Sequence, residues 1–177
     1  MKRCFLIVGP ESSGNRLLGA ILTRAGCAGR ASTDQRWDRT LPVKATPAMI
    51  IRSFPHGEDW PDLSEIYCTL EERGYQVTTL VTVRHPAATI GSQVQSGLAG
   101  SDQEACDQIA EAYQQIFQQI SRPFHLVPYE AITYGPPAAL RALLTAIGLA
   151  PVTAGPLIID GQERDLEDGN AKHFRSN

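Results

Sequence analysis

The sequence lacks any apolar run long enough to cross a bilayer. A membrane-spanning helix needs about 18 or more consecutive apolar residues, and no segment of the 177 residues approaches that length. The apolar run near the start, from Cys4 to Val8, is also shorter than the ~7–15 residues of a signal-peptide core. We therefore expect no membrane partner and a cytoplasmic location.

Positive charge is not in excess either. The 16 Lys and Arg against 19 Asp and Glu give a formal net charge of −3, and the pI is about 5.8. A dedicated nucleic-acid binder needs a surface of clustered cations that neutralises phosphates, so we expect no nucleic-acid partner. The hydrophobic content of 42% and mean hydropathy of −0.18 are typical of a soluble globular protein. We predict one domain over residues 1–177.

Cysteine is scarce and scattered. The four cysteines form no C-x-x-C pair and have no His at metal-ligand spacing; they are Cys4, Cys27, Cys68 and Cys106. This pattern predicts neither a zinc site nor a disulfide framework. We expect buried free thiols and no metal.

Short apolar runs alternate with amphipathic segments along the chain. The strand-like runs cover 3–8, 48–52, 77–83 and 124–127, with a weaker one at 157–159. The helical periodicity covers 16–25, 62–73, 86–96, 101–121 and 137–147. Strands that alternate with helices predict an α/β fold of three layers, a parallel β-sheet flanked by helices on both faces.

A Gly-rich loop follows the first strand-like run. Its sequence, Gly9-Pro10-Glu11-Ser12-Ser13-Gly14-Asn15-Arg16, has the G-x-x-x-x-G spacing of a P-loop. The backbone N–H groups of such a loop and of the following helix form a cradle for phosphate-like oxygens. We predict that the anion contacts come from Gly9, Ser12, Ser13, Gly14, Asn15 and Arg16. The alternative is a Gly-rich turn that binds nothing.

The loop is poorly suited to metal-bound ATP. A Walker loop continues after its second Gly with Lys and then Ser or Thr, which reach the terminal phosphates and Mg²⁺. Asn15 and Arg16 stand at these two positions, and the strand-like run 77–83 contains no acidic residue.

A second candidate anion site follows the strand-like run 77–83. Arg84 comes directly after it, Pro86 opens the next helix, and Ser92 stands eight positions after Arg84. Ligands of α/β proteins bind at the carboxyl ends of parallel strands, and Arg gives bidentate, charge-assisted hydrogen bonds to phosphate. We predict that Arg84 and Ser92 hold one phosphate. The alternative is a helix-capping Arg with an ordinary surface Ser.

Together these motifs resemble the sulfotransferase family that uses 3′-phosphoadenosine 5′-phosphosulfate (PAPS). In that family a loop G-P-x-K-[ST]-G-[TS]-[TS] holds the 5′-phosphosulfate, as Gly9–Arg16 would here. An R-x-P segment followed by Ser holds the 3′-phosphate. The family's Y-E-D-L segment, whose Tyr lies near the adenine, is similar to Tyr129-Glu130-Ala131-Ile132. Its closing G-x-W-K-x-x-F region is similar to residues 169–174, where Lys172 would reach the 3′-phosphate.

The resemblance implies a P-loop-type fold and a specific reaction. A sulfuryl group would move from PAPS to a hydroxyl or amine of a small-molecule or glycan acceptor, leaving 3′,5′-adenosine bisphosphate (PAP), without a metal. Residues 160–177 would form a C-terminal tail closing over the nucleotide site. The oligomeric state stays open.

Two positions depart from the family pattern. The loop Lys is replaced by Ser12, so Arg16 or Arg52 would have to supply its positive charge. The family's catalytic His is replaced by Phe54, and we expect His56, two residues later, to act as the base.

These departures keep two other functions open. A small P-loop kinase would need the Mg²⁺ and phosphate ligands that Asn15 and Arg16 replace. A nucleotide-binding module without turnover is suggested by Ser12 and Phe54.

Overall fold

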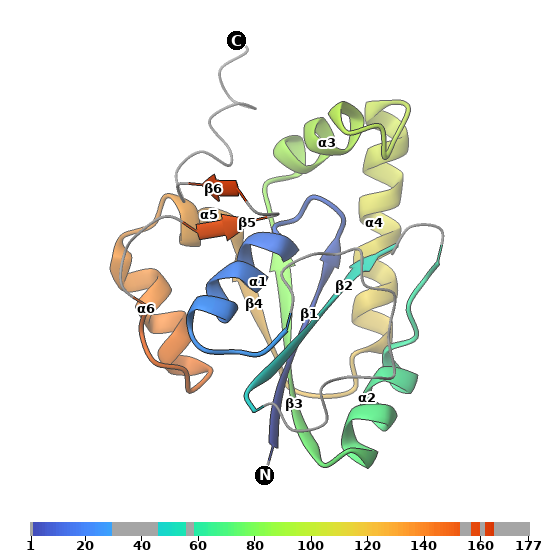
Figure 1. Ribbon diagram of the computed structural model, residues 1–177. Coiled ribbons are helices and arrows are strands. Elements are labelled where there is room, and N and C mark those ends of the chain that lie inside the picture. The colour runs from blue at the N-terminus through green and yellow to red at the C-terminus, as the bar shows by residue number, and fades with distance from the viewer. Residues whose placement is uncertain (1, 30–45, 56–58, 153–156, 160–161, 165–177) are drawn as a thin grey trace.

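A four-stranded parallel sheet forms the centre of the molecule (Figure 1). The computed structural model describes residues 2–29, 46–55, 59–152, 157–159 and 162–164. The sheet order is β2-β1-β3-β4, and its strands are β1 (Lys2–Pro10), β2 (Ala48–Phe54), β3 (Tyr75–Val83) and β4 (Phe124–Pro128). The predicted parallel sheet is confirmed.

Helices connect the strands. They are α1 (Asn15–Arg24), α2 (Leu63–Glu72), α3 (Pro86–Gln95), α4 (Asp102–Gln119), α5 (Tyr129–Thr133) and α6 (Pro137–Ala146). The start of α4 agrees with the predicted cap, since the Ser101 side chain accepts a hydrogen bond from the Glu104 N–H. Asp62 caps α2 in the same way, through the N–H groups of Ser64 and Glu65.

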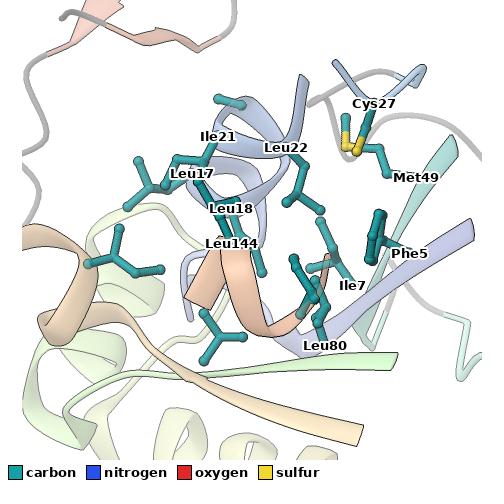
Figure 2. Packing of buried hydrophobic residues seen from close by; sticks show 14 of the residues in the cluster. Phe5, Ile7, Leu17, Leu18, Ile21, Leu22, Cys27, Met49, Leu80 and Leu144 are labelled. Atoms are coloured by element: carbon teal, nitrogen blue, oxygen red, sulfur yellow. The ribbon is translucent and has the colours of Figure 1, made fainter. Parts of the chain in front are cut away.

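The helices cover both faces of the sheet, as predicted. Because side chains alternate along a strand, Phe5 and Ile7 of β1 face one layer and Leu6 and Val8 face the other. The first layer contains α1, α5 and α6, and the second contains α2 and α4. In Figure 2 the leucines and Ile21 of α1 lie over Phe5, Ile7 and Leu80 of the sheet.

Two elements were not predicted. The single-turn helix α5 is too short to show a helical period. Strand β6 (Gln162–Arg164) pairs antiparallel with β5 (Leu157–Ile159), and β5 lies against α1. The predicted closure of residues 160–177 over the nucleotide site falls on residues that are mostly outside the described ranges.

The prediction of buried thiols is right for two cysteines and wrong for the other two. Cys4 and Cys27 are buried, and burial raises the pKa of Cys4 to about 12 and that of Cys27 to about 11. Cys68 and Cys106 are exposed because they stand on the outward faces of α2 and α4. All four are free. Within the described ranges, no helix combines the length and apolarity that crossing a membrane requires.

Leu144 anchors α6 to the rest of the fold. It is fully buried in the hydrophobic cluster that lies between α1 and the sheet (Figure 2). No other residue of α6 is fully buried. Leu144→Ala should lower the free energy of unfolding by about 2–5 kcal/mol, because the cavity adds to the lost burial. Urea denaturation measures the change. Leu143→Ala, at a half-buried position of the same helix, is the control; equal losses would contradict the assignment.

Candidate functional site

The loop between β1 and α1 has a constrained backbone. Ser12 has φ +66°, the left-handed region, and is the one non-glycine residue with positive φ among those described. Such a conformation costs of order 1–3 kcal/mol and persists only where neighbours impose it. Gly14 also has a positive φ, +105°. It stands directly before the first turn of α1, which has no side-chain cap. The loop shape therefore depends on contacts from other segments.

A buried polar network holds the loop from one side. Ser13 Oγ lies 2.6 Å from the Pro10 carbonyl oxygen and 2.7 Å from Thr82 Oγ1. Thr82 Oγ1 donates to Asn15 Oδ1 at 2.6 Å, and Asn15 Nδ2 donates to Ser53 Oγ at 3.2 Å. All four side chains are at most 4% exposed. The network thus ties the loop to both neighbouring strands, β2 and β3.

This network gives Ser13 and Asn15 a different role from the one expected of their side chains. Asn15 Nδ2 also donates to the carbonyl oxygens of Gly9 and Pro10, at 3.2 and 3.3 Å. Both side chains are directed into the protein, and the Ser13 N–H also bonds within the loop, to the Pro10 carbonyl at 3.2 Å. Whether any of these residues binds a nucleotide stays a prediction.

Gly9 is explained by the same network. A Cβ at this position would lie 2.1 Å from Thr82 Oγ1 and 2.6 Å from Ser13 Oγ. These distances are shorter than any real contact, so any other residue would push the network apart. Gly9 therefore permits the packing beneath the loop.

Arg84 and Tyr129 contact the loop from two further segments. Arg84 Nη1 donates to the Ser12 carbonyl at 2.9 Å, and the guanidinium carbon lies 4.6 Å from the centre of the Tyr129 ring. That ring packs on Gly14, where an added Cβ would lie 2.4 Å from Tyr129 Cδ2. The structure thus brings Ser12, Gly14, Arg84 and Tyr129 together at the carboxyl edge of the sheet.

The environment of Arg84 is partly buried and also acidic. Burial lowers the pKa of its guanidinium, while the phenols of Tyr129 and Tyr134 and the carboxylate of Glu130 raise it. The Glu130 carboxylate also accepts the backbone N–H of His85 at 2.9 Å, which fixes the turn after β3. An arginine keeps its charge at neutral pH, so a cation stands beside the loop.

Helix α3 contributes a residue that the sequence reasoning missed. Gln93 is 2% exposed, and its Nε2 donates to the Glu11 carbonyl at 2.9 Å. The neighbouring Ser92 is half-buried, and its carbonyl accepts hydrogen bonds from the N–H and Oγ of Ser96. The structure places Ser92 one residue from Gln93, on the helix that follows Arg84; a contact between Arg84 and Ser92 stays a prediction.

Arg16 and Arg52, the candidate replacements for the loop Lys, lie in different environments. Arg16 is exposed at the second residue of α1. Arg52 is 3% exposed on β2, its Nη1 donates to the Ile51 carbonyl at 2.7 Å, and burial lowers its pKa to about 10. By strand alternation Arg52 faces the α2 and α4 layer, on the opposite face from Ser53 and Asn15.

Two predicted residues, His56 and Lys172, lie outside the described residues. Phe54, at the position of the family's His, is completely buried, with the Trp60 ring edge-on at 6.5 Å. A phenylalanine packed in this way belongs to the core. No cluster of three or more His, Cys, Asp or Glu suited to a metal ion occurs in the described part of the chain.

The chain matches no family model and no curated protein. Among solved structures it is similar to a chain described as "Sulfotransferase Domain from the Curacin Biosynthetic Pathway". The match covers 98% of this chain and 82% of that chain, with 16% sequence identity and a TM-score of 0.49. A likeness this distant gives no residue of this chain a role.

Thr82 is the central residue of the buried network. Thr82→Val keeps the shape of the side chain but leaves Asn15 Oδ1 without its donor, in a buried position. We expect the free energy of unfolding to fall by about 1–3 kcal/mol, measured by urea denaturation. Thr78→Val, at a half-buried position of the same strand, is the control. Equal effects of the two substitutions would show that the network adds nothing to stability.

Proposed function

We propose that this chain binds PAPS and transfers its sulfuryl group to a hydroxyl or amine of a small-molecule or glycan acceptor. The observation that carries the proposal is the contact of Arg84 with the Ser12 carbonyl. It joins the two segments that the sequence assigns to the two phosphate groups of one nucleotide.

The loop and the first turn of α1 would bind the 5′-phosphosulfate. The N–H groups of Ser12 and Gly14 donate to no acceptor within the described part of the chain. The first N–H groups of a helix likewise have no acceptor inside it. Together with Arg16 at the start of α1, these donors suit an anion held by the backbone.

Arg84 and Ser92 would bind the 3′-phosphate. Arginine gives bidentate, charge-assisted hydrogen bonds to phosphate, and Arg84 stands directly beside the loop. Tyr129, packed between Arg84 and Gly14, would lie near the adenine, and Lys172 would reach the 3′-phosphate from the C-terminal segment. These assignments account for two phosphate groups on one nucleotide.

The transfer itself needs positive charge and a base. The acceptor oxygen or nitrogen attacks sulfur, the bond from sulfur to the bridging oxygen breaks, and the electron pair leaves with the 5′-phosphate of PAP. Fixed N–H donors and cations at that phosphate stabilise the developing charge. Arg16, or Arg52 from the sheet, would supply the cation where Ser12 replaces the loop Lys, and His56 would take the acceptor proton.

A kinase that uses Mg·ATP fits the site less well. Asn15, at the position of the Walker Lys, is buried and bonded to the loop and to Ser53. The following position, which would hold the Mg²⁺-binding hydroxyl, is Arg16. A binding module without turnover is favoured by one observation, the complete burial of Phe54 at the position of the family's His.

Calorimetric titration of the wild-type protein tests the nucleotide. We expect PAP to bind without metal and more tightly than ATP with Mg²⁺, because the site offers a second anion-binding segment for the 3′-phosphate. Metal-dependent binding of ATP without binding of PAP would refute the proposal in favour of the kinase. Sulfate transfer from PAPS to a panel of acceptors then separates the enzyme from the binding module, which would bind PAP and show no turnover.

Arg84→Ala tests the assignment of the 3′-phosphate. Hydrogen bonds to charged groups contribute about 1.5–3 kcal/mol, so PAP should bind roughly tenfold to a hundredfold more weakly. Adenosine 5′-monophosphate, which has no 3′-phosphate, should lose less, and only through the released Ser12 carbonyl. Both affinities are measured by calorimetry on the folded variant. Equal losses for the two ligands would refute the role given to Arg84.

A further inference from the structure

Gln93 connects helix α3 to the loop through a partly buried hydrogen bond. Its Nε2 donates to the Glu11 carbonyl at 2.9 Å, and the residue is 2% exposed. The orientation of the amide is decided by chemistry, since a carbonyl oxygen can only accept and must face Nε2. The other end of the amide, Oε1, is buried without a hydrogen-bond partner.

An unpaired buried acceptor is unfavourable. A methionine or leucine would fill a similar volume without that cost, so packing alone does not explain a glutamine here. What the glutamine adds is the donor that faces Glu11. The bond to the loop is therefore the feature that distinguishes this side chain from an apolar one.

The bond orients a specific peptide group. In a trans peptide the C=O and the following N–H point in opposite directions, so the Ser12 N–H points away from Gln93. Arg84 holds the next carbonyl, that of Ser12, and the Ser13 N–H donates to the Pro10 carbonyl at 3.2 Å. Two side chains from the β3–α3 unit thus hold consecutive carbonyls of the loop, including that of the strained Ser12.

We propose that Gln93 is a positioning residue: it holds the Glu11–Ser12 peptide so that the Ser12 N–H is presented to the 5′-phosphate group of the bound nucleotide. This inference rests on the proposed function for the identity of the ligand. The proposal also connects the two phosphate sites through α3. This helix carries Ser92, assigned to the 3′-phosphate, and through Gln93 it holds the loop assigned to the 5′-phosphate.

Gln93→Met tests the proposal in binding. The substitution removes the donor and the unpaired acceptor together, so thermal unfolding should stay cooperative with little change in midpoint. We expect PAP to bind about threefold to tenfold more weakly by calorimetry. Adenosine 3′-monophosphate, which lacks the 5′-phosphate, should bind as to the wild type. Gln95→Met, at an exposed position of the same helix, is the control and should change neither affinity.

Three outcomes would overturn the proposal. They are unchanged PAP affinity in the folded variant, equal losses for both nucleotides, and an equal effect of the Gln95 control. If Gln93→Met does not fold, Gln93→Asn is the second variant. It keeps the amide but is one methylene too short for the Glu11 carbonyl, so the same pattern of affinities is expected.

Hydrogen–deuterium exchange of the ligand-free protein separates this inference from the proposed function. Peptides covering residues 9–16 should exchange faster in Gln93→Met than in the wild type and the Gln95 control, because the Glu11 carbonyl has lost the side chain that holds it. Unchanged exchange would overturn the positioning role. If the wild type binds no PAP, the proposed function fails, and the exchange result still decides whether Gln93 holds the loop.

Discussion

The hydrogen bond from the Thr82 hydroxyl to Asn15 connects β3 to the first residue of α1, directly after the loop that joins β1 to α1. Ser13, Ser53 and Gly9 are arranged around this bond, and each is buried or closely packed against it. Because the network is buried, an unpaired donor or acceptor in it would cost free energy, so the contacts favour this arrangement of the loop. The rest of the site is built on that arrangement.

A second set of contacts acts on the same loop from outside the network. Arg84 lies in the turn after β3, Tyr129 in α5 and Gln93 in α3, and they contact the Ser12 carbonyl, Gly14 and the Glu11 carbonyl respectively. The loop is thereby fixed on both sides before any ligand binds. Under the proposed function, the loop would not have to order its backbone when it binds the anion, which favours affinity.

The distribution of charge agrees with a small anionic ligand in an acidic protein. The net charge is −3, yet Arg16 stands at the start of α1 and Arg84 beside the loop. Arg52 is buried in β2 and remains protonated at neutral pH, since its pKa is about 10. Phe54, which stands where the sulfotransferase family has its His, is completely buried, so the proposed function assigns the base to His56 instead.

Much of the architecture could be predicted from the sequence. The strand at 77–83 and the helix starting at Ser101 were recognisable because β-branched runs, amphipathic periods and capping residues are local properties. The helix α5 and strand β6 were missed because they are too short to show a period. The sequence also placed residues 9–16 and Arg84 after the ends of parallel strands, and the resemblance to the sulfotransferase family added Tyr129 to the same site.

The sequence by itself determined the layered α/β fold, the loop and the candidate anion-binding residues. Only the tertiary structure decided which side chains of the loop face inward, that Gln93 reaches the Glu11 carbonyl, and that Tyr129 packs between Gly14 and Arg84. The physical reason is that strand and helix signals come from neighbours in the chain. The buried hydrogen bond between Asn15 and Thr82 depends on how α1 packs on the sheet, and that between Gln93 and Glu11 on how α3 packs, and no local pattern specifies either.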